Sequence, residues 1–144
     1  MTTIDPNLKS LLDAPVGQIA NTLEKILKCH VNLDIIEQNS TSGTEFVRKI
    51  TITAKELPVI RAVVKFDSQV LPSNVLSQLL KKKDGIGTIL TKNSIKAHRK
   101  VTSLSFDQNG EKVMRNYQIV YNSSVWFQIS EEIRLDYIIT SKNG

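Results

Sequence analysis

Four β-rich stretches of the chain are joined in pairs by very short turns, and this spacing constrains the fold more than any other feature. "TEFVRKITITA" is separated from "LPVIRAVVKFD" only by "KE", and "KVMRNYQIVY" is separated from "VWFQISEEIRLDYII" only by "NSS". Connections of this length reverse the chain in a hairpin, whereas parallel neighbours need a crossover of a dozen or more residues. The sequence therefore predicts antiparallel strand pairs over 44–67 and 112–139.

Two further extended segments complete the predicted sheet. Residues 29–38 alternate apolar and polar side chains and are followed by a predicted loop, "NSTSG". Residues 94–106 precede a predicted turn at "DQNGE", which again is short enough for antiparallel neighbours. Together these segments give a sheet of about six strands.

Helices are predicted where apolar residues recur at helical spacing. A short opening helix has Asp5 as its N-cap and Pro6 at its first position, and further helices cover about 18–28 and 71–83. The glycine-punctuated connector that follows is predicted to contain one helical turn. The predicted fold class is α+β, with helices packed on an antiparallel sheet, in a single domain over residues 1–144.

Composition and charge narrow the function classes. The 144 residues are 40% hydrophobic and 23% charged, which is enough for one domain with a sizeable core. The only cysteine, Cys29, forms no internal disulfide and no CxxC pair, and we interpret it as a small structural side chain. No apolar run is long enough to span a membrane and no signal pattern opens the chain, so we expect a cytoplasmic protein, or a stromal one in a plastid, with no membrane partner.

The net charge of +5 is distributed rather than concentrated. Lys81, Lys82 and Lys83 form the only basic run, and they end a predicted helix, where cations favour the negative end of the dipole. We interpret this run as a solvated helix end and predict no nucleic-acid partner. A modest positive field would attract a small anionic substrate.

Two charged residues fall on otherwise apolar strand faces. Because strand side chains alternate between faces, Arg48 shares a face with Phe46, Ile50 and Ile52. Glu131 shares a face with Val125, Phe127, Ile129, Ile133, Leu135 and Tyr137. In one interpretation Arg48 and Glu131 pair with each other, or reach solvent at a sheet edge, and have a structural role. In the other, they face an apolar cavity for an organic acid, with Arg48 on its carboxylate and Glu131 on a hydroxyl or C–H proton.

Other candidate residues point to no site. His30 and His98 stand alone without a second ligand at metal-binding spacing, so we predict no metal. Arg115 lies near a strand end and is predicted at the surface or rim. Trp126 falls on the polar face of its strand and is predicted to pack beneath a helix or loop. "GIG" at 85–87 has little specificity as a phosphate-binding motif.

The order and spacing of several short patterns resemble the chorismate pyruvate-lyase (4-hydroxybenzoate synthase) family, in particular its shorter archaeal, cyanobacterial and plastid-type branch. The patterns are "GQIANTLEKIL", "VRKI", "LPSNVLSQL", "GIGTIL", "AHRKV" and "RNYQIVYNSSVWFQISE", and they span most of the chain. The resemblance implies a chorismate lyase-like fold, an antiparallel six-stranded sheet backed by helices around an enclosed ligand cavity.

The resemblance also implies a site. Arg48 in "VRKI" matches the arginine that binds the ring carboxylate, and Glu131 in "ISE" matches the glutamate beside the ring hydroxyl. Backbone contacts to the ligand would fall at Ile86 and near Ile19. The chain departs from the family at Thr88, where relatives often carry arginine, and after Ala62, where many place a polar residue. These departures bear on substrate range and rate more than on ligand class.

The activity that the resemblance implies is a cofactor-free carbon–oxygen lyase reaction. Chorismate would lose its enolpyruvyl ether as pyruvate and aromatise to 4-hydroxybenzoate, for quinone or related aromatic biosynthesis. Arg48 and Glu131 would be its catalytic residues, and we expect Arg48→Ala or Glu131→Gln to abolish turnover. The alternative is a non-catalytic module of the same fold that senses or carries a small aromatic carboxylate. A nucleic-acid binder ranks last, and the sequence makes no prediction of oligomeric state.

Overall fold

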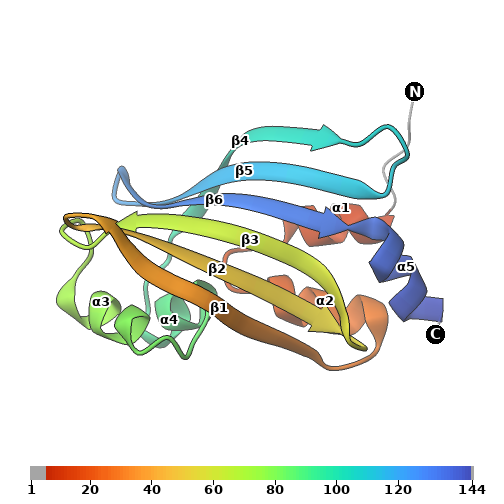
Figure 1. The fold of residues 1–144 in the computed structure, drawn as a ribbon, viewed down its shortest axis with the longest axis horizontal. Coiled ribbons are helices and arrows are strands. Elements are labelled where there is room, and N and C mark those ends of the chain that lie inside the picture. The colour runs from red at the N-terminus through yellow and green to blue at the C-terminus, as the bar shows by residue number, and fades with distance from the viewer. Residues whose placement is uncertain (1–5, 144) are drawn as a thin grey trace.

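The computed structural model describes residues 6–143, and this part of the chain forms six strands and five helices. In chain order they are α1 (Pro6–Asp13), α2 (Ile19–Leu27), β1 (Val31–Ser42), β2 (Glu45–Ala54), β3 (Leu57–Asp67), α3 (Ser73–Leu80), α4 (Ile86–Lys92), β4 (His98–Phe106), β5 (Lys112–Tyr121), β6 (Ser124–Arg134) and α5 (Leu135–Asn143) (Figure 1). All strands belong to one antiparallel sheet in the order β1-β2-β3-β6-β5-β4. The predicted α+β fold class is confirmed.

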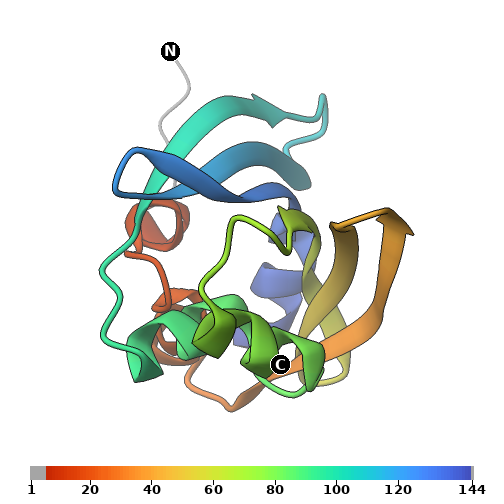
Figure 2. The ribbon, with the colours of Figure 1, turned by 90° about the vertical axis from the view of Figure 1, so that its left-hand side faces the viewer.

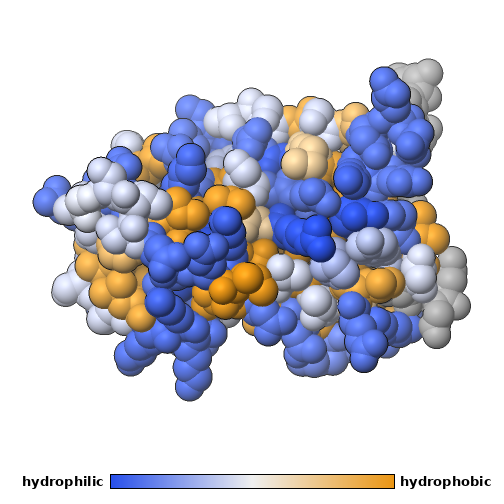
Figure 3. All heavy atoms as spheres, in the orientation of Figure 1, coloured by the Kyte–Doolittle hydropathy of each residue, from blue (hydrophilic) through white to orange (hydrophobic). Residues whose placement is uncertain are grey.

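The sheet is strongly curved, and the helices occupy its concave side. Figure 2 shows β4, β5 and β6 across the top and β1, β2 and β3 down the right, with α1 to α4 closing the left and lower sides. The opposite face of the sheet carries exposed polar side chains such as Lys49, Arg61 and Ser130. The side of the molecule shown in Figure 3 has many hydrophilic residues, with groups of hydrophobic residues between them. One packed face and one solvated face is the usual arrangement of an antiparallel sheet.

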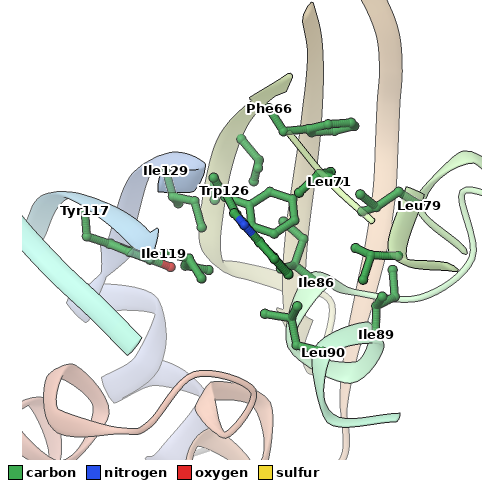
Figure 4. Close-up of a cluster of buried hydrophobic side chains, with 14 residues drawn as sticks. Phe66, Leu71, Leu79, Ile86, Ile89, Leu90, Tyr117, Ile119, Trp126 and Ile129 are labelled. Carbon is green, nitrogen blue, oxygen red and sulfur yellow. The ribbon is translucent and has the colours of Figure 1, made fainter. Parts of the chain in front are cut away.

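Two clusters of buried side chains form the core. The first lies between the sheet and α3–α4, and Figure 4 shows Trp126 between Tyr117, Ile119 and Ile129 on one side and the residues of the helical layer on the other. The second joins α1 and α2 to the sheet, and includes Leu11, Leu23, Ile60, Val113 and Ile133. Burying each such side chain contributes about 1.5–3 kcal/mol, so these clusters hold the helices against the sheet.

Both predicted hairpins are confirmed, and each has a two-residue turn. Lys55 and Glu56 connect β2 to β3 with φ of 49° and 71°, and Asn122 and Ser123 connect β5 to β6 with φ of 48° and 65°. Positive φ at both central residues gives a turn whose twist matches that of the flanking strands. The short turns therefore set the register that carries the inward-facing residues.

Three predicted element boundaries are wrong, and Asp5 lies outside the described residues. The segment "NSTSG" is not a loop, because β1 pairs with β2 as far as Ser42 and only Gly43 and Thr44 turn. Residues 94–97 do not belong to β4, which begins at His98.

The predicted last strand also ends early, at Arg134, where α5 begins. Arg134 donates to the carboxylate of Asp136 over 3.0 and 2.6 Å, and its guanidinium carbon lies 3.9 Å from the centroid of the Tyr137 ring. The Leu135 N–H donates to the carbonyl of Glu111 over 2.7 Å. These contacts turn the chain out of the sheet, so the strand face assigned to Leu135 and Tyr137 is wrong.

Two β-bulges change which side chains face inward. In β1, Ile36 is the extra residue and is 65% exposed. In β6, Trp126 is the extra residue between Val125 and Phe127, which pair with successive residues of β5. A bulge reverses the alternation beyond it. The expected inward position of Val125 is therefore wrong, since it is 38% exposed, whereas Trp126 is buried and packs against Tyr121 at 4.9 Å between ring centroids.

Candidate functional site

Arg48 is a fully buried cation on the inner face of β2. Its Nε donates to Gln38 Oε1 over 2.6 Å, Nη1 to the carbonyl of Asp84 over 2.8 Å, and Nη2 to the carbonyl of Leu79 over 3.0 Å. None of the ion pairs formed by residues 6–140 includes Arg48. All three partners are neutral, so they hold the guanidinium in place without forming an ion pair with it.

The sequence analysis missed Gln38, which sits directly opposite Arg48 in the β1–β2 ladder. The bulge at Ile36 shifts the alternation of β1 and brings Gln38 to the inner face, where it is 4% exposed. Its Nε2 donates to the same Leu79 carbonyl over 2.9 Å. Leu79 lies in the last turn of α3, where carbonyls have no partner within the helix and the dipole attracts cations. The end of α3 is thus bound to both side chains.

Glu131 is also buried, and its partner is Arg115 rather than Arg48. Arg115 Nε donates to Glu131 Oε1 over 2.9 Å, and Arg115 Nη2 lies 2.8 Å from the same oxygen. The Tyr117 hydroxyl donates to Oε2 over 3.2 Å. The expectation that Arg115 lies at the surface is wrong, because it is 2% exposed and donates through Nη1 to the carbonyl of Leu12, at the end of α1. The packing of α1 over the strand buries it.

The sheet register explains why Arg48 and Glu131 do not pair. Arg48 pairs with Val64 on β3, whereas Glu131 pairs with Ala62 on β3 and Arg115 on β5. Arg48 and Glu131 are therefore two strands and one inward-facing row apart, roughly 12 Å between backbones at ordinary strand spacings. Arg115 directly opposite is the nearer partner.

Arg48 and Glu131 nevertheless face one cavity of about 120 Å³ between the sheet and the helices. Ile19 at the start of α2 and Ile86 at the start of α4 line it as well, so the structure brings all four predicted site residues together. Thr88, which stands where relatives often carry arginine, is also on its wall. The other lining side chains are mostly apolar and include Ile50, Ile60, Ala62, Val64, Ile119 and Ile129. The result is an apolar chamber with charged groups at separate points of its wall.

Two glycines bring the segments that cover this cavity into backbone contact. Gly17 precedes α2 with φ of 89°, and Gly87 belongs to α4. A Cβ on Gly87 would lie 2.3 Å from the Gly17 Cα, which is closer than any side chain tolerates. Both glycines line the cavity. The close approach of the two segments therefore requires glycine at this point.

Arg99 on β4 is a third charged residue on the cavity wall, and the sequence analysis did not identify it. Its Nη1 donates to the carbonyl of Ala14 over 2.5 Å, and its guanidinium carbon lies 4.8 Å from the centroid of the Tyr117 ring. The Nε atom is buried and has no hydrogen-bond partner among the described residues. A signal was available, because Arg99 shares a face of β4 with Val101, and these two residues pair with Ile119 and Tyr117 on the inner face of β5.

Burial shifts the titration of two of these groups. Desolvation lowers the pKa of Arg48 to about 10, with the negative charge of Asp84 acting in the opposite direction, so the guanidinium stays cationic at neutral pH. Desolvation, and then the nearby Glu131 charge, raise the pKa of Tyr117 above its usual range. The phenol therefore keeps its proton and donates a hydrogen bond to Glu131.

The remaining candidates add no second site. No three His, Cys, Asp or Glu side chains in the described part of the chain are grouped so that they could hold a metal ion. His30 lies 2.8 Å from a Glu24 carboxylate oxygen, but its side chain is largely in solvent. None of the described helices has the length and apolarity needed to cross a membrane.

Comparison with known proteins identifies the fold but no family. No protein-family model and no curated protein sequence matches the chain. Among solved structures, PhnF from Mycobacterium smegmatis is similar with a TM-score of 0.60 and 9% identity over 82% of this chain, which corresponds to only 64% of PhnF. The separate effector domain of PhnF matches with a TM-score of 0.58 and 9% identity, over 81% of this chain and 88% of that one.

A third similar structure is the ligand-binding domain of a putative GntR-family transcriptional regulator from Bordetella bronchiseptica. Its TM-score is 0.51 at 8% identity, over 74% of this chain and 86% of that one. Identities this low show a shared fold alone, and activity has to be argued from the site. The structural neighbours are thus PhnF, its effector domain and a ligand-binding domain, and what this chain shares with them is the fold.

Proposed function

We propose that the protein binds a small organic acid, of the aromatic carboxylate class, and acts as a sensing or carrier module. The observation that carries this proposal is the buried Arg48 guanidinium at the wall of an apolar cavity, where no carboxylate among the described residues forms an ion pair with it. A buried charge without a counter-ion is costly, and the planar fork of arginine matches a carboxylate. A ligand carboxylate would supply the missing charge. The fold shared with effector and ligand-binding domains supports the same conclusion.

The other features of the cavity suit a ligand with one apolar body. Its volume of about 120 Å³ is of the order of engineered apolar cavities, roughly 150 Å³, that take up benzene. Glu131 offers oxygens to a ligand hydroxyl at a point well separated from Arg48. Because Arg115 and Tyr117 already bind Glu131, its carboxylate is better placed to accept a hydrogen bond than to remove a proton. This favours binding over proton abstraction.

A chorismate lyase is the second candidate, and one observation favours it. Arg48, Glu131, Ile19 and Ile86 line the same cavity, as the family resemblance implies for a lyase. In that case the ring carboxylate of chorismate would lie at Arg48 and the ring hydroxyl at Glu131. The cavity would hold one conformer away from water while the ring aromatises and pyruvate leaves. The product 4-hydroxybenzoate would serve quinone or related aromatic biosynthesis.

Calorimetric titration with 4-hydroxybenzoate tests the binding proposal. We expect saturable binding by the wild type and a loss of about ten- to a hundredfold in affinity in Arg48→Met, the range for a hydrogen-bonded charged group. Arg61→Met is the matched control, because Arg61 is exposed on the opposite face of the neighbouring strand β3. Thermal unfolding would establish that each variant is folded. Equal affinity in folded Arg48→Met would contradict the assignment.

Incubation with chorismate separates the two candidates. Pyruvate and 4-hydroxybenzoate released in equal amounts, and lost in Glu131→Gln, would establish a lyase. Binding without product above the uncatalysed rate is the result expected of a sensing or carrier module.

A further inference from the structure

The charged groups on the cavity wall do not balance. Glu131 is neutralised by Arg115, with 2.8 Å between Nη2 and Oε1. Arg48 and Arg99 remain, and no ion pair among residues 6–140 includes either of them. The acidic residue next to Arg48 in space, Asp84, binds Lys92 through its carboxylate over 3.0 Å. The wall therefore carries two uncompensated positive charges.

Arg99 is held as a ligand-binding group would be. The carbonyl of Ala14 and the ring of Tyr117 fix its guanidinium, and both are neutral. Its Nε is buried with no partner among the described residues, which leaves a desolvated donor beside the cavity. A buried donor without a partner costs free energy, and an anionic oxygen is its strongest acceptor.

We propose that the ligand is a dianion with two separate carboxylate groups, one bound by Arg48 and the other by Arg99. This inference rests on the proposed function and adds the charge of the ligand to it. The two arginines come from β2 and β4, which are four strand spacings apart in the sheet, roughly 19 Å along its surface. Because the sheet is strongly curved (Figure 2), both side chains line the same cavity although their strands are this far apart. The two carboxylates therefore lie at opposite ends of the ligand.

A dianion requirement discriminates between related molecules. Chorismate has two carboxylates, whereas 4-hydroxybenzoate has one. In a cavity with two arginines, chorismate is bound more tightly than 4-hydroxybenzoate, whether the protein senses chorismate or converts it. A ligand with one carboxylate leaves Arg99 unpaired in the complex.

Calorimetric titration with matched acids tests the proposal. The probes are linear dicarboxylates from succinate to suberate, each with the monocarboxylate of the same chain length, and terephthalate with benzoate. The variants are Arg99→Gln and, as the matched control, Lys100→Gln, which removes an exposed charge from the other face of β4. The series of lengths samples the separation of the two guanidinium groups.

We expect the best dicarboxylate to bind the wild type about ten- to a hundredfold more tightly than its matched monocarboxylate. Arg99→Gln removes this preference and keeps the affinity for the monocarboxylate, and Lys100→Gln behaves as the wild type. Arg48→Gln weakens the binding of both acids.

Three results would overturn the inference. If the wild type binds each dicarboxylate no better than its monocarboxylate, a comparison that needs no variant, the ligand is not a dianion and the proposed function still stands. A preference that survives in Arg99→Gln removes Arg99 from the site. Failure of the wild type to bind any of these acids overturns the dianion and the proposed function together.

Discussion

Gln38 keeps the charge of Arg48 available to a ligand. The two buried arginines of the inner face, Arg48 and Arg115, differ mainly in the side chain opposite them. Arg115 has the carboxylate of Glu131, which cancels its charge, whereas Arg48 has an amide, which orients the guanidinium and leaves it positive. Glutamate in place of Gln38 would therefore give Arg48 a carboxylate partner like that of Arg115.

The variant Gln38→Glu tests this difference directly. We expect its affinity for benzoate to fall at least about tenfold, because the new carboxylate forms an ion pair with Arg48 and competes with the carboxylate of the ligand. Gln38→Leu is the matched control, since it also loses the hydrogen bond to Leu79 but provides no carboxylate to pair with Arg48. Calorimetric titration of both proteins provides the comparison. The same affinity in both variants would show that orientation, and not charge, governs binding.

The Arg115–Glu131 pair predicts strong coupling between its members. Arg115→Met or Glu131→Leu alone leaves a buried charge without its partner and should lower the free energy of unfolding by about 3–5 kcal/mol. The double variant replaces both charges by apolar groups and should lose much less than the sum. Urea denaturation measures all three. The exposed pair Lys49–Glu37 is the control, and Lys49→Met should cost at most about 1 kcal/mol. Simple addition of the two single losses would contradict the coupling.

At this scale the sequence identified the inward residues of regular strand segments. Arg48 and Glu131 were found because alternation holds around both of them. Gln38 was missed because the bulge at Ile36 shifts the alternation, and nothing in the local sequence marks a bulge. Arg115 was misplaced because its burial depends on α1, about a hundred residues away in the chain. Tertiary packing of this kind has no local signal.

At the scale of elements, the segment that leads into α2 contacts α4 where Gly17 meets Gly87. We predict that Gly87→Ala lowers the free energy of unfolding by about 1–3 kcal/mol, because the added Cβ meets backbone that has to move. Gly85→Ala in the same segment is the matched control. Its φ is −68°, and its Cβ would meet only the side chain of Leu33, with the nearest methyl carbon at 3.0 Å. Thermal denaturation compares the two. Equal stability in both variants would show that the glycine contact is not tight in solution.

The predicted elements succeeded where the length of a connection decides the structure, and failed where a particular strand pairing or side-chain contact decides it. The turns at Lys55–Glu56 and Asn122–Ser123 follow from the spacing of the β-rich stretches alone. By contrast, "NSTSG" has the composition of a loop but is extended because β2 pairs with it. The apolar alternation after Arg134 continues in the sequence, yet the contacts of Arg134 with Asp136 and Tyr137 start a helix.

For the whole molecule, the central strands of the sheet differ from the edge strand β4 in strand pairing and in burial. Strands β3 and β6 pair on both sides, whereas β4 pairs only with β5 and has exposed side chains along nearly its whole length. We predict that native-state hydrogen exchange gives lower opening free energies for β4 amides than for those of β3 and β6. Amide exchange followed by NMR measures them residue by residue. Equal protection of β4 and β3 would indicate that another surface covers the edge in solution.

Fold class was accessible from the sequence because hairpin spacing limits how six strands are arranged. The composition of the cavity was accessible only in part, since its wall is assembled from the inner faces of all six strands and from two helical segments. This assembly determines which arginines can bind a ligand carboxylate. Arg115 is paired with Glu131, whereas Arg48 and Arg99 have neutral partners.

The single tryptophan gives the molecule an internal optical reporter. Trp126 belongs to the same buried cluster as Ile86, Ile119, Ile129 and Tyr117, all of which line the cavity. Its indole is shielded from water by that cluster, so its emission depends on the packing around it. Light that excites only tryptophan therefore reads the neighbourhood of the cavity without any attached dye. One fluorescence signal can follow both unfolding in denaturant and the arrival of a ligand.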